Sequence, residues 1–192
     1  MIPPLDDNFW SERYLNGHTG WDVGEPATPL RTYIEQLTNK QIDILIPGCG
    51  NAWEAKLLCD LGFNSVTLID ISSHLVAMLR QKVEHLPLTI LHGDFFDHHG
   101  QYDLILEQTF FCALDPALRS QYVSKMHALL RPGGKLVGVL FDRMFEGGPP
   151  FGGSKQEYEA LFAPVFNHVK LEPCYNSIEA RLNSEVFLIA RK

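Results

Sequence analysis

The sequence predicts an α/β fold in which a mostly parallel sheet of seven strands carries helices on both faces. Between residues 42 and 141, short apolar runs rich in β-branched residues alternate about four times with segments of helical spacing. Such alternation is typical of parallel sheets whose faces are covered by helices. Two further apolar stretches near the C-terminus predict an antiparallel hairpin on the sheet. A length of 192 residues and a hydrophobic fraction of 45% fit a single domain, residues 1–192.

Most of the predicted elements have boundary signals in the sequence. The first strand closes at a Pro-Gly pair, and Gly62 is expected to stop the helix that follows. The second strand ends at Asp70, and Ser72 or Ser73 can cap the next helix. A turn at residues 131–134 precedes the fifth strand. The expected strands are 42–46, 66–69, 88–91, 102–106, 135–141, 166–171 and 184–190, and the expected helices are 52–61, 72–83, 116–130 and 155–162.

The N-terminal part of the chain precedes the first strand and has a different character. Residues 1–40 are expected to form helical pieces around a polar, aromatic loop. This segment can cover the carboxyl edge of the sheet, where open α/β sheets bind ligands. We therefore expect an N-terminal lid segment, 1–40, and a core, 41–192, within one domain.

Composition excludes several classes of protein. The formal net charge of −7 disfavours a nucleic-acid binder, which would normally be basic. No apolar run approaches the roughly 18 residues of a membrane span, and the N-terminus lacks the basic start of a signal peptide. The four cysteines are widely spaced and form no CxxC pair, which disfavours disulfides and zinc. We expect a cytoplasmic protein without a metal, acting as a monomer or weak homodimer on a small molecule.

A glycine turn follows the first strand and directly precedes a helix. Gly48 and Gly50 would let the backbone approach a ligand closely, while the start of the helix offers free N–H groups. Trp53 stands where the dinucleotide fingerprint has its last small residue, so NAD or FAD binding is disfavoured. The turn taken alone is equally consistent with a plain tight turn.

Two acidic residues follow the next two strands. Asp70 can accept hydrogen bonds from the hydroxyls of an adenosine ribose. Asp94 can bind the adenine amino group while Phe95 contacts the ring face. Both carboxylates could instead cap a helix or a loop.

A glycine turn followed by these two acids resembles the Rossmann-like class I S-adenosylmethionine (SAM) methyltransferases. Further blocks resemble the thiopurine S-methyltransferase superfamily, which includes halide and thiol methyltransferases. The N-terminal blocks are FWSERY from Phe9 and GHTGWD from Gly17. The others are IPGCGNA from Ile46, FFCAL from Phe110 with Pro116 and Arg119, and GGPPF from Gly147.

The resemblance implies SAM as the cofactor and assigns expected roles to individual residues. It assigns no catalytic side chain. The implied cofactor-binding residues are Trp10, Trp21, Gly48, Gly50, Asp70, Asp94, Phe95, Glu107 and Gln108, and the implied substrate-binding residues are Trp21, Phe111 and Phe151.

The resemblance implies methyl transfer to a small thiol, hydrosulfide or halide ion. Such nucleophiles need no general base, which suits a sequence without a Ser-His-Asp, Cys-His or HExxH arrangement. Thiopurine or metalloid methylation is an alternative, although the thiopurine branch has Asp-Arg where Glu107 and Gln108 stand. A non-catalytic SAM-binding module and a nucleotide-dependent oxidoreductase are further alternatives.

Overall fold

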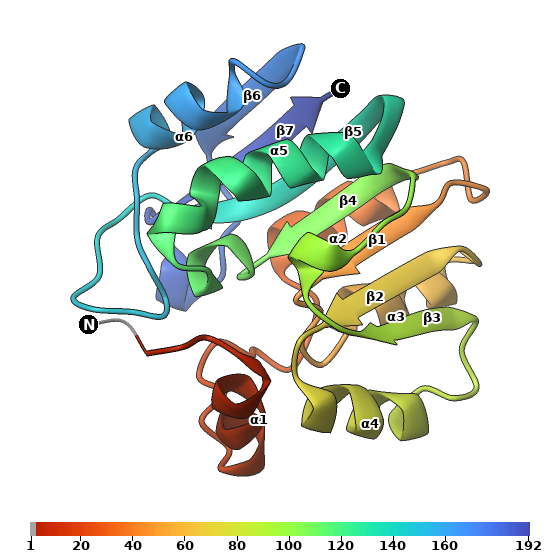
Figure 1. Cartoon of the computed structure of the whole chain (residues 1–192). Helices are drawn as coiled ribbons and strands as arrows, with labels where there is room; N and C mark the ends of the chain where they lie inside the picture. The colour runs from red at the N-terminus through yellow and green to blue at the C-terminus, as the bar shows by residue number, and fades with distance from the viewer. Residues whose placement is uncertain (1–2) are drawn as a thin grey trace.

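The computed structural model describes residues 3–192, which contain a seven-stranded sheet. The strand order is β3-β2-β1-β4-β5-β7-β6, and β7 runs in the opposite direction to the other six strands. The mostly parallel sheet and the antiparallel C-terminal pair are therefore confirmed (Figure 1). The strands are β1 (Ile44–Pro47), β2 (Val66–Asp70), β3 (Leu88–His92), β4 (Tyr102–Gln108), β5 (Leu130–Phe141), β6 (His168–Pro173) and β7 (Glu185–Arg191).

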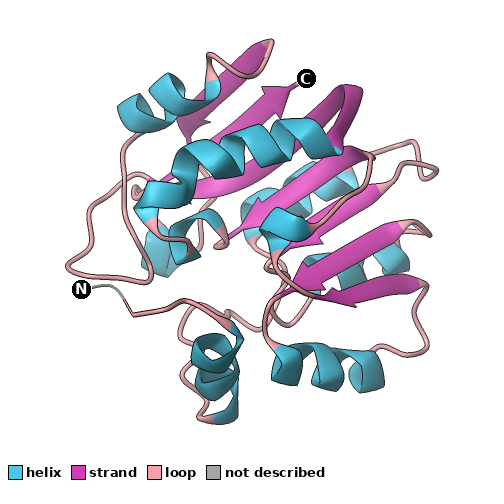
Figure 2. Ribbon diagram, viewed as in Figure 1, coloured by secondary structure: helices cyan, strands magenta, loops and turns pink. Residues whose placement is uncertain are grey.

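Helices cover both faces of the sheet (Figure 2). One buried core cluster joins α5 and α6 to the sheet, and the other joins α2, α3 and α4 to it. Among the described residues, no helix is both long enough and apolar enough to cross a membrane. The α-helices are α1 (Asp7–Leu15), α2 (Thr28–Glu35), α3 (Trp53–Asp60), α4 (Ser73–Lys82), α5 (Arg119–Leu129) and α6 (Lys155–Phe162), and short 3₁₀ turns are η1 (Phe95–Asp97), η2 (Phe111–Ala113), η3 (Pro116–Leu118) and η4 (Glu179–Arg181).

The N-terminal segment divides into two parts with different packing. Leu30 and Ile34 of α2 are fully buried in the same core cluster as β1 and α3. In contrast, α1 has no buried residue. Within the segment 1–40 predicted to form a lid, α2 therefore packs in the core, whereas α1 does not.

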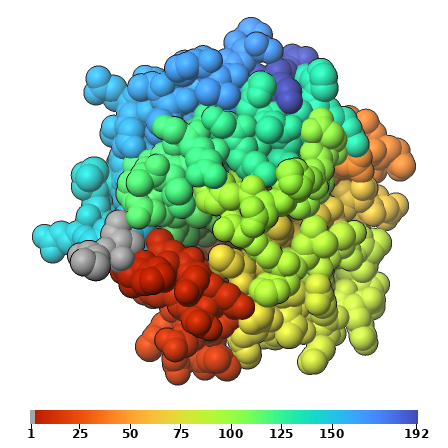
Figure 3. All heavy atoms as spheres, in the orientation of Figure 1, coloured from red at the N-terminus to blue at the C-terminus, as the bar shows by residue number. Residues whose placement is uncertain are grey.

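Helix α1 lies beyond the carboxyl ends of the strands, beside the start of α4 (Figure 1). The backbone N–H and the hydroxyl of Ser73 donate to the Asp7 carboxylate at 2.7 and 3.0 Å. The hydroxyls of Ser11 and Ser72 lie 2.9 Å apart. In Figure 3 the red N-terminal segment lies against the green part of the chain that follows β4. These contacts hold α1 over the edge of the sheet at which ligands bind in open α/β folds.

One expected element is corrected by the structure. Residues 131–134 belong to β5 and do not form a separate turn before it. Tyr102 of β4 pairs with Leu130, but Leu104 pairs with Lys135, so β5 bulges between these two pairs. Gly133 has φ of +81° within the bulge, a conformation that glycine adopts without a steric penalty. The glycines therefore allow an irregularity inside a continuous strand.

Candidate active site

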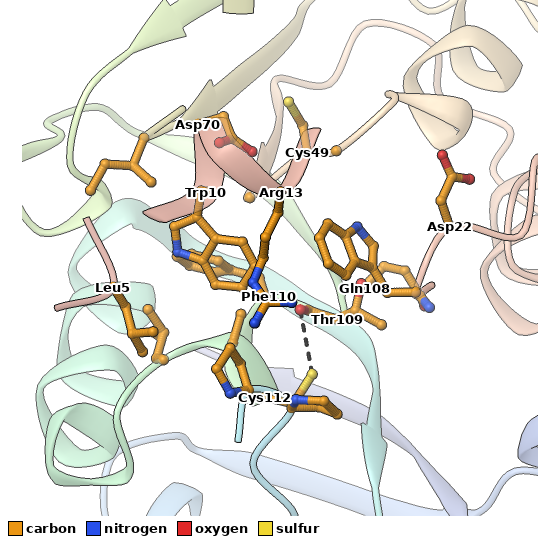
Figure 4. A pocket seen from close by; sticks show the side chains of 18 of the residues that line it. Leu5, Trp10, Arg13, Asp22, Cys49, Asp70, Gln108, Thr109, Phe110 and Cys112 are labelled. Carbon is orange, nitrogen blue, oxygen red and sulfur yellow. Dashed lines mark hydrogen bonds between the residues drawn. The ribbon is translucent and has the colours of Figure 1, made fainter. Parts of the chain in front are cut away.

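A cavity of about 1000 Å³ lies at the carboxyl edge of the sheet. The strand order reverses between β1 and β4, and ligands of open α/β folds bind at such a switch point. The walls come from the N-terminal segment, from the turns that follow β1, β2, β3 and β4, and from the chain after β5 (Figure 4). Of the residues predicted to bind the cofactor, Trp10, Trp21, Gly48, Gly50, Asp70, Asp94, Phe95 and Gln108 line this cavity.

The glycine turn has the backbone that the sequence predicts for a ligand-binding loop. Gly48 has φ of +56°, and a Cβ on it would lie 2.4 Å from the ring of Phe110. Gly50 has φ of +51°, and a Cβ on it would lie 3.6 Å from the Tyr14 hydroxyl, an ordinary contact, so its backbone conformation alone favours glycine. The turn ends at Ala52, which is also left-handed with φ of +58° and precedes the first residue of α3.

Asp70 ends β2 and brings a buried carboxylate to the cavity wall. Burial raises its pKa from an ordinary 3.8 to about 6, partly offset by hydrogen bonds from the backbone amides of Ser72, Gly50 and Ile71. The bond from the Ser72 N–H is 2.9 Å long. A buried carboxylate with a raised pKa at a cavity wall is typical of a functional site.

Asp94 and Phe95 come directly after Gly93, at the end of β3, and border the cavity. The Asp94 carboxylate accepts a hydrogen bond of 2.8 Å from the Phe96 N–H and therefore caps η1, while its side chain also borders the cavity. Phe95 is buried and packs edge to face against Phe96 and Phe110. Asp94 therefore has the capping role that the sequence allowed, and it also borders the cavity.

Aromatic rings from the N-terminal segment form a further wall. Trp21 packs edge to face against Trp10 and Tyr14, with ring centroids 5.6 and 5.7 Å away. The backbone carbonyl of Trp21 accepts a hydrogen bond of 2.8 Å from Arg181. Trp21 is therefore held at the cavity wall by its ring and by its backbone.

Asp22 ties this aromatic segment to the glycine turn. Its carboxylate accepts hydrogen bonds from the indole N–H of Trp53 and the backbone N–H of Gly24, both 2.8 Å long, and from the Asn51 amide. Although burial raises the pKa of Asp22, these bonds hold it below its ordinary value. The bulky Trp53 in the glycine motif therefore anchors the covering segment, a role that no small residue could fill.

Three of the predicted site residues do not line the cavity. Glu107 is fully buried on the other side of β4, because neighbouring residues of a strand point to opposite faces. Its carboxylate accepts hydrogen bonds from the N–H groups of Phe110 and Phe111, at 2.9 and 3.0 Å, and from the Tyr122 hydroxyl, at 2.5 Å. Glu107 therefore supports the turn after β4 from the side of the strand that faces away from the cavity, and in this structure it does not border the space predicted to hold the cofactor.

The two other residues that do not line the cavity are aromatic residues expected to bind the substrate. Phe111 is buried in the core, where its ring packs against Tyr122 and Tyr158. Phe151 is also buried outside the cavity, and its N–H donates to the Cys112 carbonyl at 2.6 Å. Their sequence neighbours take the cavity positions instead, namely Phe110, Pro149 and Pro150.

Comparison with known proteins decides the family. The sequence model of the family described as Thiopurine S-methyltransferase matches residues 5–186. The chain belongs to the thiopurine S-methyltransferase family. A probable thiol methyltransferase 2 of Arabidopsis thaliana is 33% identical over 164 residues, which cover 81% of this chain and 72% of that protein. Thiocyanate methyltransferase 1 of Brassica oleracea is 28% identical over 190 residues, covering 94% and 83% of the two chains.

Solved structures confirm the Rossmann-like methyltransferase fold. One is the 1,6-didemethyltoxoflavin-N1-methyltransferase of Burkholderia thailandensis, crystallised with bound 1,6-didemethyltoxoflavin and S-adenosylhomocysteine. It matches with a TM-score of 0.73 and 18% identity over 97% of this chain and 86% of that one. At this identity the match supports the fold alone. Family membership makes the protein a SAM-dependent methyltransferase, as the sequence motifs indicate.

The residues that line the cavity also fit SAM when they are considered apart from the family comparison. Gln108 Oε1 and Arg13 Nε are buried and have no hydrogen-bond partner, and both side chains border the cavity. Buried polar atoms are almost always paired in folded proteins, so these two atoms indicate a ligand. Among residues 3–192, no group of three or more His, Cys, Asp or Glu side chains is placed to hold a metal ion.

Sequence reasoning did not assign Arg13, Phe110 or the Pro149-Pro150 pair to the site. Phe110 is adjacent to an assigned residue, and the proline pair lies in a motif that was recognised. Arg13 also lies in a recognised motif, but only the structure shows that its side chain enters the cavity. Its neighbours in the sequence contain several carboxylates, so no pattern indicates that it lacks an ionic partner.

Proposed function

We propose that this cavity transfers the methyl group of SAM to a small sulfur nucleophile, such as a thiol or hydrosulfide, and also to halide ions. The observation that carries this proposal is the set of aromatic residues Trp10, Trp21 and Phe110 lining a cavity that also contains the buried, unpaired Oε1 of Gln108. The thiol and thiocyanate methyltransferases among the relatives support the same class of acceptor.

The cofactor half of the cavity lies along β1, β2 and β3 in this proposal. The backbone of Gly48 and Gly50 approaches the cofactor closely, and Asp70 accepts hydrogen bonds from the ribose hydroxyls. Asp94 and Phe95 bind the adenine by its amino group and its ring face. The left-handed glycines, the buried carboxylate and the buried aromatic ring at these positions support the assignments.

The transfer half of the cavity lies between the N-terminal segment and the end of β4. SAM supplies an activated methyl group on a positively charged sulfur atom. Aromatic faces attract such a cation, so Trp10 and Trp21 are suited to hold it and to exclude water from the reaction. Positioning of this kind is the main requirement of an in-line displacement, and an anionic acceptor needs no general base.

The cavity's own cysteines are poor competitors for the methyl group. Burial, together with the nearby Glu107 carboxylate, raises the pKa of the Cys112 thiol to about 12. Burial also raises the pKa of Cys49. Because the thiolate is the nucleophilic form, both side chains remain neutral and unreactive while a soluble thiolate or hydrosulfide reacts.

We further propose that the segment before α2 orders over the bound cofactor as a lid, and that the protein acts as a monomer or weak homodimer in the cytoplasm, without nucleic acid. The lid role is supported by the contacts of Trp21 and Asp22 at the cavity wall. Hydrogen exchange of residues 3–25 should slow when S-adenosylhomocysteine binds. Equal protection with and without the ligand would argue against a lid.

A panel of acceptors tests the proposed reaction. The protein is incubated with SAM and hydrosulfide, ethanethiol, thiocyanate, iodide or an aryl thiol, and the volatile methylated product is measured in the headspace. We expect kcat/KM to be higher for hydrosulfide, ethanethiol and the inorganic anions than for the aryl thiol. Preference for the aryl thiol would indicate a thiopurine-type enzyme, and binding of SAM without any product would indicate a non-catalytic module.

A matched pair of variants connects the reaction to this cavity. Asp70→Ala should lower activity through weaker cofactor binding. Asp60→Ala removes an exposed carboxylate that pairs with Lys56 outside the cavity and should leave activity unchanged.

A further inference from the structure

Arg13 extends from α1 into the cavity. Figure 4 shows its side chain beside Trp10, directed toward Phe110 and Cys112 at the end of β4. Its guanidinium carbon lies 4.5 Å from the centroid of the Phe9 ring and 5.9 Å from that of Trp10. Stacking on aromatic faces fixes the plane of a guanidinium and leaves its N–H edge free to bind a ligand.

Arg13 carries a charge that the protein leaves without a counterion. Its Nε atom is buried and has no hydrogen-bond partner. Within residues 3–192, no carboxylate lies at ion-pair distance from it, and its guanidinium makes no hydrogen bond. Arg13 as a whole is only partly buried, but its Nε–H is buried and lacks an acceptor. Because a guanidinium keeps its positive charge in proteins, an anion is the acceptor that suits this N–H best.

The other two arginines at the cavity differ in this respect. Arg181 donates to the Trp21 carbonyl at 2.8 Å and has the Glu185 carboxylate 3.7 Å away. Arg143 is exposed and lies over the Phe145 ring, where water can solvate it. Arg13 is thus the cavity arginine that combines a buried N–H with the lack of a protein partner.

We propose that Arg13 is a positioning and specificity-determining residue that binds the acceptor as a monovalent anion, such as hydrosulfide, thiolate, thiocyanate or iodide. This inference rests on the proposed function, because it assigns a charge to the acceptor of that reaction. The head of Arg13 lies near Phe110 and Cys112, at the end of β4, and Asp70 lies elsewhere on the cavity wall (Figure 4). This placement favours the transfer half of the cavity.

Binding of the acceptor through its negative charge also explains why the methylated product is released. An electron pair of the anion forms the new bond to the methyl carbon, while the bond between that carbon and the donor sulfur breaks and leaves its electron pair on the sulfur. No proton moves, and the methylated product is neutral. Arg13 therefore attracts the substrate but not the product.

The cofactor's carboxylate is the other anion that Arg13 could bind, so the experiment separates the two. Calorimetry measures the affinity for S-adenosylhomocysteine first, and then the affinity of that complex for thiocyanate. Arg13→Met removes the charge and keeps a long, flexible side chain. Arg13→Lys keeps the charge but lacks the planar guanidinium, which can donate two parallel hydrogen bonds. Arg80→Met is the matched control, since Arg80 is exposed, lies on α4 and does not border the cavity.

We expect Arg13→Met to weaken thiocyanate binding about tenfold or more, the scale of a lost charge-assisted hydrogen bond, with S-adenosylhomocysteine affinity changed less than about twofold. The thiocyanate affinity of Arg13→Lys should lie between those of Arg13→Met and the wild type, and the affinity of Arg80→Met should match that of the wild type. In steady-state assays, the KM for thiocyanate should rise in Arg13→Met. Because α1 contributes no buried residue, the two Arg13 variants should have the same melting temperature as the wild type.

Unchanged thiocyanate affinity in Arg13→Met would overturn the proposal. A tenfold loss of S-adenosylhomocysteine affinity, with normal thiocyanate binding to the saturated complex, would assign Arg13 to the cofactor carboxylate and also overturn it. Thiocyanate binding is measured without turnover. If it depends on Arg13 while no acceptor is methylated, the anion site stands and the proposed reaction fails.

Discussion

Replacing Asp70 by Asn should make the ligand-free protein more stable while weakening its binding of cofactor. Asp70 is buried at the end of β2, where its negative charge has few compensating groups. Asn keeps an oxygen that can accept the hydrogen bond from the Ser72 N–H, which in the wild type is 2.9 Å long. The substitution therefore removes mainly the charge.

The size of the effect follows from the raised pKa. Burial shifts the pKa of Asp70 from 3.8 to about 6. At 1.36 kcal/mol per pKa unit, this shift corresponds to roughly 3 kcal/mol of unfolding free energy. A carboxyl group with a raised pKa contributes stability fully below pH 3.8, and that contribution is lost as the pH rises through about 6. At pH 8, the Asp70→Asn variant should have an unfolding free energy up to about 3 kcal/mol higher than the wild type. At pH 5 this gain should be smaller by about 1–2 kcal/mol.

Urea unfolding of both proteins at pH 5 and pH 8 measures this difference, and calorimetry measures binding of S-adenosylhomocysteine. Loss of the charged acceptor for ribose should weaken binding by about 1–3 kcal/mol, or roughly 10- to 100-fold. A variant that is less stable than the wild type at pH 8, or a gain that does not depend on pH, would contradict the argument about burial. Unchanged affinity in the folded variant would remove Asp70 from the cofactor site.

Three further substitutions test other parts of the cavity. Trp21→Ala should lower kcat strongly with little change in the ligand-free melting temperature; near-normal turnover at saturation would show that the ring only anchors the segment. Gly48→Ala should weaken S-adenosylhomocysteine binding at least about tenfold, because φ is +56° and the new methyl group would meet Phe110; calorimetry showing normal affinity would refute this. Glu107→Ala leaves three buried donors unpaired and should lower the unfolding free energy by roughly 3 kcal/mol or more; a loss below about 1 kcal/mol in urea would contradict this.

The fold was largely predictable from the sequence because local signals agreed with the global topology. The strands β1 to β4 are short apolar runs, and α-helices connect β1 to β2, β2 to β3 and β4 to β5. The exception is the start of β5, where glycines at 133 and 134 suggested a turn. In the structure, pairing with β4 continues on both sides of these glycines, and the sheet accommodates them as a bulge.

The cavity residues were predictable where the backbone alone fixes their place. Gly48 and Asp70 follow parallel strands, whose carboxyl ends meet at one edge of the sheet. After β4, two of the predicted residues, Glu107 and Phe111, do not line the cavity, because alternation along a strand does not say which face borders it. Thr109 has φ of +56°, and the turn at this residue brings Phe110 to the cavity while the next side chain enters the core. A left-handed threonine is uncommon and has no sequence signal.

Transfer of a labelled methyl group tests the central claim most directly. The wild-type protein is incubated with hydrosulfide and SAM that carries a trideuterated methyl group, and the headspace and solution are analysed by mass spectrometry. We predict trideuterated methanethiol and S-adenosylhomocysteine in equal amounts, and Asp70→Ala should reduce both together. Formation of neither product from a folded protein that binds SAM, or release of S-adenosylhomocysteine without labelled methanethiol, would contradict the proposal that this cavity methylates small sulfur nucleophiles.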